Sequence, residues 1–229
     1  MNFLQMVNRL RLEVGASGAD LLSLGGTLSQ ENTRLKTWIA QAWQDIQSAH
    51  GQWKFMLNDV SFPTVIGQSV YASSVVGADF QSWKRDSFRA YLTATGFPDE
   101  QIIGFLDFPT YRNLYALGSS RTTTGRPVLF SVDQSKNFVI GPVPDAVYTV
   151  IGQAYGRAAG SVLSADTDTP RAAFDEAWHM AVVWKALESY AIYESAQEVL
   201  TRALRESTRL MSRLEHDQLP EMTYGAPLA

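Results

Sequence analysis

Cysteine is absent from this 229-residue chain. Disulfide bonds, thiolate metal sites, iron–sulfur clusters and a cysteine nucleophile are therefore excluded. No run of about 18 apolar residues is present, so the sequence predicts no membrane-spanning helix. Polar Gln5 and Asn8 and charged Arg9 interrupt the apolar core that a secretory signal would need. We expect a soluble protein that is made in a cytoplasm and has no membrane partner.

Charged residues are scarce, at 18% of the chain, where ordinary soluble domains have about 25%. Lys and Arg number 19 and Asp and Glu number 23, which gives a net charge of −4. The sequence pI of about 5.4 argues against a protein that binds nucleic acid mainly by electrostatics, since such domains have a pI above about 9. A chain with few charges and 45% hydrophobic residues favours a surface that is partly covered in an assembly.

Both ends of the chain show apolar residues at steps of three and four, which is the pattern of amphipathic helices. We expect helices over residues 3–14, 31–56, 174–196 and 196–217. The third of these is apolar almost all round, as is typical of a buried helix. A linker rich in Asp and Thr, residues 164–170, precedes it.

The middle of the chain, about residues 59–164, changes to the alternating pattern of strands. It predicts a hairpin over 65–71 with Gly67 at its turn, and strands at 128–132, 138–140 and 147–155. A short helix is expected at 109–117.

The predicted order of helices, strands and helices indicates an α+β fold, in which terminal helices pack as a bundle around a β-rich, antiparallel insertion. The predicted domains are a discontinuous helical domain of residues 1–57 and 165–218, and a β domain of residues 58–164. Residues 219–229, which contain Gly225 and Pro227, form an extended tail.

No catalytic, metal-binding or cofactor-binding pattern is evident. Glu176 and His179 form one Glu-x-x-His, whereas a di-iron bundle needs two such motifs and two further glutamates. Asp166 and Asp168 resemble the start of a calcium loop without its glycine and bidentate glutamate, so capping or turn roles are expected. His50 lies late in the helix expected over 31–56, where it is expected to be a packing residue or a residue of the C-terminal turn. An enzyme site assembled from distant residues remains the alternative.

Two features suggest contacts with a partner. Arginines spaced by three and four share one face of the last predicted helix: Arg202, Arg205, Arg209 and Arg213. The simpler interpretation is a solvated face with ion pairs to nearby glutamates, and the alternative is an acidic or phosphate-bearing partner. Trp83, at the start of a segment with several basic residues, is a candidate interface anchor, because Trp and Arg dominate such sites.

The order of several short motifs along most of the chain resembles one protein family. They are Val7-Asn8-Arg9-Leu10, Trp38-Ile39-x-x-Ala42-Trp43, Trp53-Lys54-Phe55, Gly67-x-x-x-Tyr71, Trp83-Lys84-Arg85-Asp86-Ser87-Phe88, Gly125-Arg126-Pro127, Gly141-Pro142-Val143-Pro144 and Asp217-Gln218-Leu219-Pro220. In this order they are similar to the adaptor, or head-to-tail connector, proteins of tailed bacteriophages, of the type called tail tubular protein A or tail accessory factor.

The resemblance implies a structural protein of the virion neck, without catalysis or cofactor, that is made in the host cytoplasm. Such proteins form a ring, usually of twelve copies, beneath the portal. The helical part contacts the portal, and the β part faces the next tail component, such as a tail nozzle. Genome DNA passes through the ring on ejection without sequence-specific binding. Another virion ring, such as a stopper or tail terminator, is the alternative within this class.

The resemblance also places the candidate contact residues. Portal binding is expected from residues of the C-terminal segment, namely Leu219, Pro220, Met222, Tyr224 and Leu228. In some adaptors this segment becomes ordered only on docking. The four arginines and Trp83 are expected at an interface with a neighbouring subunit, and for the arginines the portal is the alternative partner.

Overall fold

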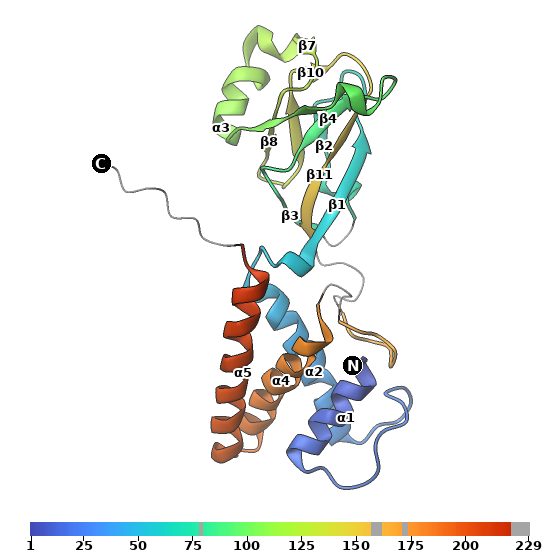
Figure 1. Cartoon of the computed structure of the whole chain (residues 1–229), viewed down its shortest axis with the longest axis vertical. Coiled ribbons are helices and arrows are strands. Elements are labelled where there is room, and N and C mark those ends of the chain that lie inside the picture. Colours follow the sequence, from blue (N-terminus) through green and yellow to red (C-terminus); the bar gives the residue numbers. More distant parts are fainter. Residues whose placement is uncertain (78–79, 157–161, 171–173, 221–229) are drawn as a thin grey trace, which may run out of the picture. The chain divides into compact units, whose positions relative to one another are not determined.

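The computed structural model describes residues 1–77, 80–156, 162–170 and 174–220. It divides into two compact units, one of Met1–Met56 with Arg157–Ala229 and the other of Leu57–Gly156 (Figure 1). We call them the helical unit and the β unit. The sequence placed the boundaries at 57/58 and 164/165, whereas the units divide at 56/57 and 156/157. Helices in one unit and mainly antiparallel sheets in the other confirm the α+β fold.

The helical unit is built around one central helix. Its main helices are α1 (Phe3–Val14), α2 (Gln30–Ala49), α4 (His179–Tyr193) and α5 (Gln197–Gln218). Helix α4 contacts the other three helices (Figure 1). These contacts explain why α4 is apolar almost all round, because a helix with neighbours on several sides has little solvated face. Helix α1 begins at the Asn2 cap and ends at Gly15, whose φ of 70° suits a residue without a side chain.

Two helix boundaries differ from the prediction. Helix α2 ends at Ala49 and not near residue 56, because His50 is extended and the chain turns at Gly51. The Trp53 indole then donates a hydrogen bond of 2.9 Å to the Ile46 carbonyl, so its ring returns to the core from outside the helix. Helix α4 begins at His179, after a 3-10 turn at Glu176–Trp178, and Phe174 is buried ahead of it.

The β unit contains two sheets. The first has the order β1 (Leu57–Pro63), β11 (Tyr148–Gly156), β4 (Arg89–Leu92) and β5 (Gln101–Ile102), and β3 (Phe80–Trp83) also pairs with β11. The second has the order β2 (Val70–Tyr71), β9 (Phe138–Gly141), β8 (Leu129–Val132) and β6 (Gly104–Phe105). The short strands β7 (Thr124–Gly125) and β10 (Val143–Pro144) form a separate pair. Most pairs are antiparallel, while β6–β8 and β7–β10 are parallel.

Aromatic rings from both sheets form the core of the β unit. Phe130 and Phe138 stack with ring centroids 4.6 Å apart, and Phe88 meets both rings at 4.9 and 4.8 Å. All three side chains are almost fully buried. Burial of one Phe side chain stabilises a fold by about 1.5–3 kcal/mol, so this cluster accounts for much of the cohesion between the sheets.

The predicted hairpin over residues 65–71 is wrong, although Gly67 does lie in a turn with a φ of 80°. Strand β1 pairs with β11 and strand β2 pairs with β9, so the turn connects the two sheets. The predicted strands around the 133–137 turn are confirmed as the antiparallel pair β8 and β9. Asp133 closes that turn by accepting hydrogen bonds of 2.8 Å from the backbone N–H groups of Ser135 and Asn137. The short helix is also confirmed, as α3 (Phe108–Tyr111) continued by a wider turn to Ala116.

Candidate interaction surfaces

Helix α5 has one buried face and two exposed flanks. Its buried residues are Ala203, Ser207, Leu210 and Leu214. One flank carries the four arginines that were predicted to share a face. On the second flank, Leu204 is 46% exposed and Met211 is half-buried. Both flanks are therefore candidates for contact with another molecule.

The first flank carries Arg202, Arg205, Arg209 and Arg213, all exposed, which we call the arginine ridge. Arg202 lies 3.1 Å from the Glu13 carboxylate of α1, and its guanidinium stands 5.0 Å from the centre of the Trp184 ring. Arg209 pairs with Glu206 at 2.8 Å. Intramolecular ion pairs thus account for two of the four arginines. The Arg209 pair is of the kind that the simpler interpretation expects, whereas the partner of Arg202 comes from another helix.

The other two arginines of the ridge are less engaged. Arg205 has a side chain that is 83% exposed, and its Nε lies 3.8 Å from Glu206, which already binds Arg209. Arg213 has no ion pair with any residue in the described part of the chain. An exposed ion pair stabilises a fold by only about 0–1 kcal/mol, so such contacts hold the arginines weakly. The ridge therefore retains positive charge that its own unit does not neutralise.

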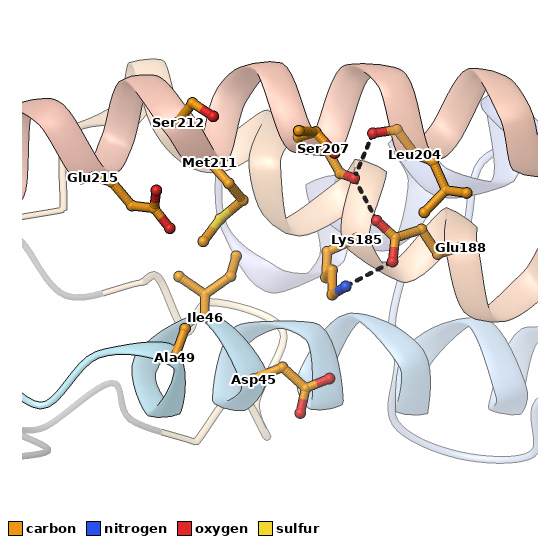
Figure 2. A pocket seen from close by; sticks show the side chains of 11 residues that line it. Asp45, Ile46, Ala49, Lys185, Glu188, Leu204, Ser207, Met211, Ser212 and Glu215 are labelled. Atoms are coloured by element: carbon orange, nitrogen blue, oxygen red, sulfur yellow. Dashed lines mark hydrogen bonds and ion pairs between the residues drawn. The ribbon is translucent and has the colours of Figure 1, made fainter.

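The second flank borders an open groove of about 380 Å³, which is lined by residues of α2, α4 and α5. Figure 2 shows side chains of α5 along one wall, side chains of α2 along the other, and Glu188 of α4 between them. Its apolar lining consists of Ile46, Ala49, Leu204 and Met211. Its charged lining consists of three carboxylates and one lysine: Asp45, Glu188, Glu215 and Lys185. We call it the acidic groove.

Glu188 is the best-held carboxylate of the groove. The residue is 8% exposed, and both of its carboxylate oxygens have partners. Oε1 accepts a short hydrogen bond from the Ser207 hydroxyl, and Oε2 lies 2.6 Å from the Lys185 ammonium group (Figure 2). Burial of a carboxylate costs free energy unless such partners bind it. The position of Glu188 is consequently fixed.

The other two carboxylates differ in their engagement. Glu215 Oε1 lies 3.0 Å from His50 Nε2, which ties α5 to the C-cap of α2 at one end of the groove. His50 thus stands at the C-cap just beyond α2, whereas the predicted helix continued past it to residue 56. The Asp45 side chain is exposed, and its carboxylate has no hydrogen bond or ion pair with any other described residue. Its charge therefore remains available to a partner.

The C-terminal segment is described only in part. Leu219 is half-buried and its backbone N–H donates a hydrogen bond of 3.0 Å to the Glu215 carbonyl, while Pro220 is exposed. The other predicted portal-binding residues, Met222, Tyr224 and Leu228, lie outside the described residues. Portal binding by this segment stays a prediction.

Trp83 lies in the core of the β unit. It is 5% exposed, its indole N–H donates a hydrogen bond of 2.9 Å to the Lys136 carbonyl, and its ring meets Phe138 at 5.1 Å. Packing within its own unit thus accounts for the ring. Because so little of it reaches the surface, Trp83 is a weaker candidate for a subunit contact than the arginine ridge.

His179, Asp166 and Asp168, the candidate metal ligands of the sequence, bind other groups of the protein. His179 Nδ1 lies 2.6 Å from the Met1 amino group, which also binds Glu176 at 2.7 Å. Asp166 lies in a turn, as expected, but its carboxylate accepts hydrogen bonds from the Ser23 hydroxyl and the Leu24 N–H, which tie the linker to the loop before α2. Within the described ranges no group of three His, Cys, Asp or Glu residues could hold a metal ion.

Asp168 also has the expected turn role. Its carboxylate accepts hydrogen bonds of 2.7 Å from the backbone N–H groups of Ser164 and Ala165. These bonds favour the ionised form and lower the pKa of Asp168. The linker before α4 is thereby held by its own side chains.

Sequence reasoning found the arginine ridge but missed the acidic groove. The ridge shows a helical spacing within one segment, whereas Asp45, Glu188 and Glu215 come from three different helices. Only the packing of α2, α4 and α5 brings them together, and no local pattern indicates it.

Of the helices in the described part of the chain, none has the length and hydropathy that crossing a bilayer requires.

Comparison with known proteins gives one family. The model of the family described as SU10 adaptor protein matches residues 1–228. No curated protein matches the chain. Since the family model covers nearly the whole chain, both units included, this protein belongs to the SU10 adaptor protein family.

Proposed function

We propose that the protein forms a ring between the portal and the tail of a phage, which extends the DNA channel and attaches the next tail component. The observation that carries this proposal is the family match over residues 1–228, which makes the chain a structural phage adaptor. An adaptor of this kind associates with portal and tail components in the virion neck. The ring, its copy number and its contacts are our proposal.

In this proposal the two units have different partners. The helical unit contacts the portal, assisted by Leu219, Pro220, Met222, Tyr224 and Leu228. The β unit faces the next tail component. The exposed arginine ridge supports a contact of the helical unit with a neighbouring subunit, because Arg205 and Arg213 retain charge that the unit does not use.

The charge of the chain suits a conduit for DNA. We propose a dodecamer, and twelve copies at −4 each carry about −48. Binding to phosphates requires clusters of Lys and Arg, so a ring of this charge lets the genome pass on ejection without holding it. No catalytic step is part of this role.

Sedimentation of the purified chain, alone and with the portal protein, tests the proposal. We expect a monomer or weak oligomer that becomes a ring on the portal, which electron microscopy of the same sample would image. A stable dimer that ignores the portal would contradict it. A ring that forms on a tail component but not on the portal would indicate a stopper or tail terminator instead.

A further inference from the structure

We propose that the arginine ridge of one protomer docks into the acidic groove of the next copy, so that α5 carries both halves of the repeating subunit contact. This inference rests on the proposed ring and specifies how its subunits recognise one another. The occupant of the groove is a second copy of this chain, and the argument for it is complementarity of position, charge and length.

The two surfaces lie on different flanks of one helix. Each residue of an α-helix advances by about 100°, which places the ridge and the groove-lining residues of α5 about 135° apart around its axis. The ridge borders α1, where Arg202 meets Glu13, and the groove borders α2, where Glu215 meets His50. A protomer can therefore engage one neighbour on each side at the same time.

The charges of the two surfaces are opposite. The groove holds three carboxylates and one lysine, for a net charge of −2. Arg205 and Arg213 supply two positive charges that their own unit leaves largely unpaired. Asp45, which is exposed and whose carboxylate has no described partner, is the carboxylate best placed to receive one of them.

The lengths of the two surfaces also agree. Arg205 and Arg213 are separated by eight residues, about 12 Å along a helix with a rise of 1.5 Å per residue. On α5, Ser207 binds Glu188 and lies eight residues before Glu215. The spacing of the two arginines thus matches the length of the groove between the levels of Glu188 and Glu215.

Apolar surface between the charges supports the same contact. Met211 lines the groove between Glu188 and Glu215, and Leu204, which is 46% exposed in the isolated chain, lines it beside Glu188. Arginine stems are aliphatic and pack on such surface while their guanidinium groups reach the rim. Docking of the ridge would cover these side chains and remove water from the ion pairs.

A contact between two different surfaces of the same chain is heterologous and repeats from copy to copy. It yields a closed ring when the rotation closes and an open filament when it does not. An isologous dimer, by contrast, would use one surface twice. The arrangement on α5 therefore fits a ring protein better than a dimer.

Charge reversal on the full-length chain tests this contact. The ridge variant is Arg205→Glu with Arg213→Glu, and the groove variant is Asp45→Lys with Ser212→Lys. All four positions are exposed, so the fold should tolerate the changes. The control is Arg112→Glu with Arg121→Glu, exposed arginines of the β unit that change the net charge by the same amount as the ridge variant.

We expect each of the two interface variants alone to reduce the fraction of protein in portal-bound rings by about tenfold or more, because like charges then face each other across the contact. The combined variant, which carries all four changes in one chain, should recover ring formation. Sedimentation with portal protein measures this fraction, and thermal melting checks that each variant is folded.

The possible failures are distinguishable. If the wild-type chain forms no ring, the proposed function itself is contradicted, and this contact with it. If the wild-type chain and the ridge variant both form rings, only the contact is wrong. If the folded combined variant does not recover, the ridge has another partner, such as the portal. If the ridge variant forms rings but loses affinity for duplex DNA, the ridge serves DNA and the inference is overturned.

Discussion

Gly152 shows how a single residue determines packing in the β unit. A Cβ atom at this position would lie 2.4 Å from Cδ1 of Phe88, whose ring is almost fully buried. The missing side chain of Gly152 thus leaves the space into which Phe88 packs. Any larger residue must displace this ring from the aromatic core.

We predict that Gly152→Ala destabilises the protein by about 1–3 kcal/mol, the usual effect of overpacking a close-packed core. Thermal melting of the purified variant measures it. Gly125→Ala is the matched control, because a Cβ there would meet only Pro142 at 3.9 Å, an ordinary contact distance. Equal melting temperatures for Gly152→Ala and the wild type would show that the Phe88 ring moves without strain.

The contact between Asp99 and Arg126 makes stability dependent on pH at the acid end. Arg126 Nη1 lies 2.7 and 2.8 Å from the two carboxylate oxygens of Asp99. These hydrogen bonds are the main cause that lowers the pKa of Asp99 below its ordinary value of 3.8, followed by the bond from the Leu92 N–H. The folded state therefore holds this carboxylate ionised where the unfolded state would protonate it.

We predict that this contribution to stability is fully present above pH 3.8 and is lost as the pH falls through the lower pKa of the folded state. Asp99→Asn should flatten the pH dependence of stability in that acid range. Urea unfolding at a series of pH values measures the difference between variant and wild type. If the free energy of unfolding has the same pH dependence in variant and wild type below pH 4, the contact with Arg126 does not lower the pKa of Asp99.

At the scale of elements, α5 combines a core face with two flanks of different chemistry. Glu13 and Glu206 neutralise part of the arginine ridge, and the ridge contains no lysine. Such a narrow strip is a poor site for a duplex, whose affinity comes from the neutralisation of many phosphates.

We predict that Arg205→Ala with Arg213→Ala leaves the weak affinity of the protein for nonspecific duplex DNA unchanged. Fluorescence anisotropy of a labelled duplex at two salt concentrations measures this affinity, with Arg112→Ala and Arg121→Ala as the control pair. Binding that falls steeply with salt and disappears in the ridge variant would identify DNA as the partner instead.

The sequence allowed elements to be predicted better than their partners. The period of residues 3–14 predicted α1 because both caps and the apolar stripe are local features. The same periodicity misled at residues 50–56, since Trp53 reaches the core through a turn and still matches a helical step of four from Ala49. The 65–71 hairpin failed because alternation of residues indicates a strand but does not indicate which strand pairs with it.

The candidate surfaces divide in the same way. A helical spacing revealed the arginine ridge, whose four members belong to one segment. The basic residues beside Trp83 suggested an interface anchor, and only the packing of the two sheets shows that its ring is buried. The acidic groove depends on the packing of three helices, which a single sequence does not reveal.

At the scale of the whole molecule, the proposed function gives the C-terminal segment, residues 219–229, a role in portal binding and none in the stability of the fold. Described contacts of the helical unit reach Gln218, whose side chain accepts a hydrogen bond of 3.1 Å from the Phe55 N–H, and Leu219. The proposed portal contacts begin at the same point of the chain.

We predict that truncation after Leu219 leaves the melting temperature nearly unchanged and weakens portal binding. Tyr224 is the expected main anchor, because a tyrosine combines a large apolar ring with a hydrogen-bonding tip. Cosedimentation with the portal protein measures the loss, and Tyr224→Ala in the full chain should reproduce part of it. Wild-type affinity in the truncated chain would remove this segment from the docking mechanism, and a chain that fails to fold would assign it to the core.

The pairing of β1 with β11 has a consequence for how such proteins diversify. Leu57, the first residue of the β unit, lies opposite Tyr155, which is one residue from its end. The two attachment points are therefore about one strand spacing apart, roughly 5 Å, which is the geometry that lets a whole domain be inserted between neighbouring residues of a host. Under the proposed function, exchange of the β unit as a cassette would change the tail component that the ring receives and leave the helical unit intact.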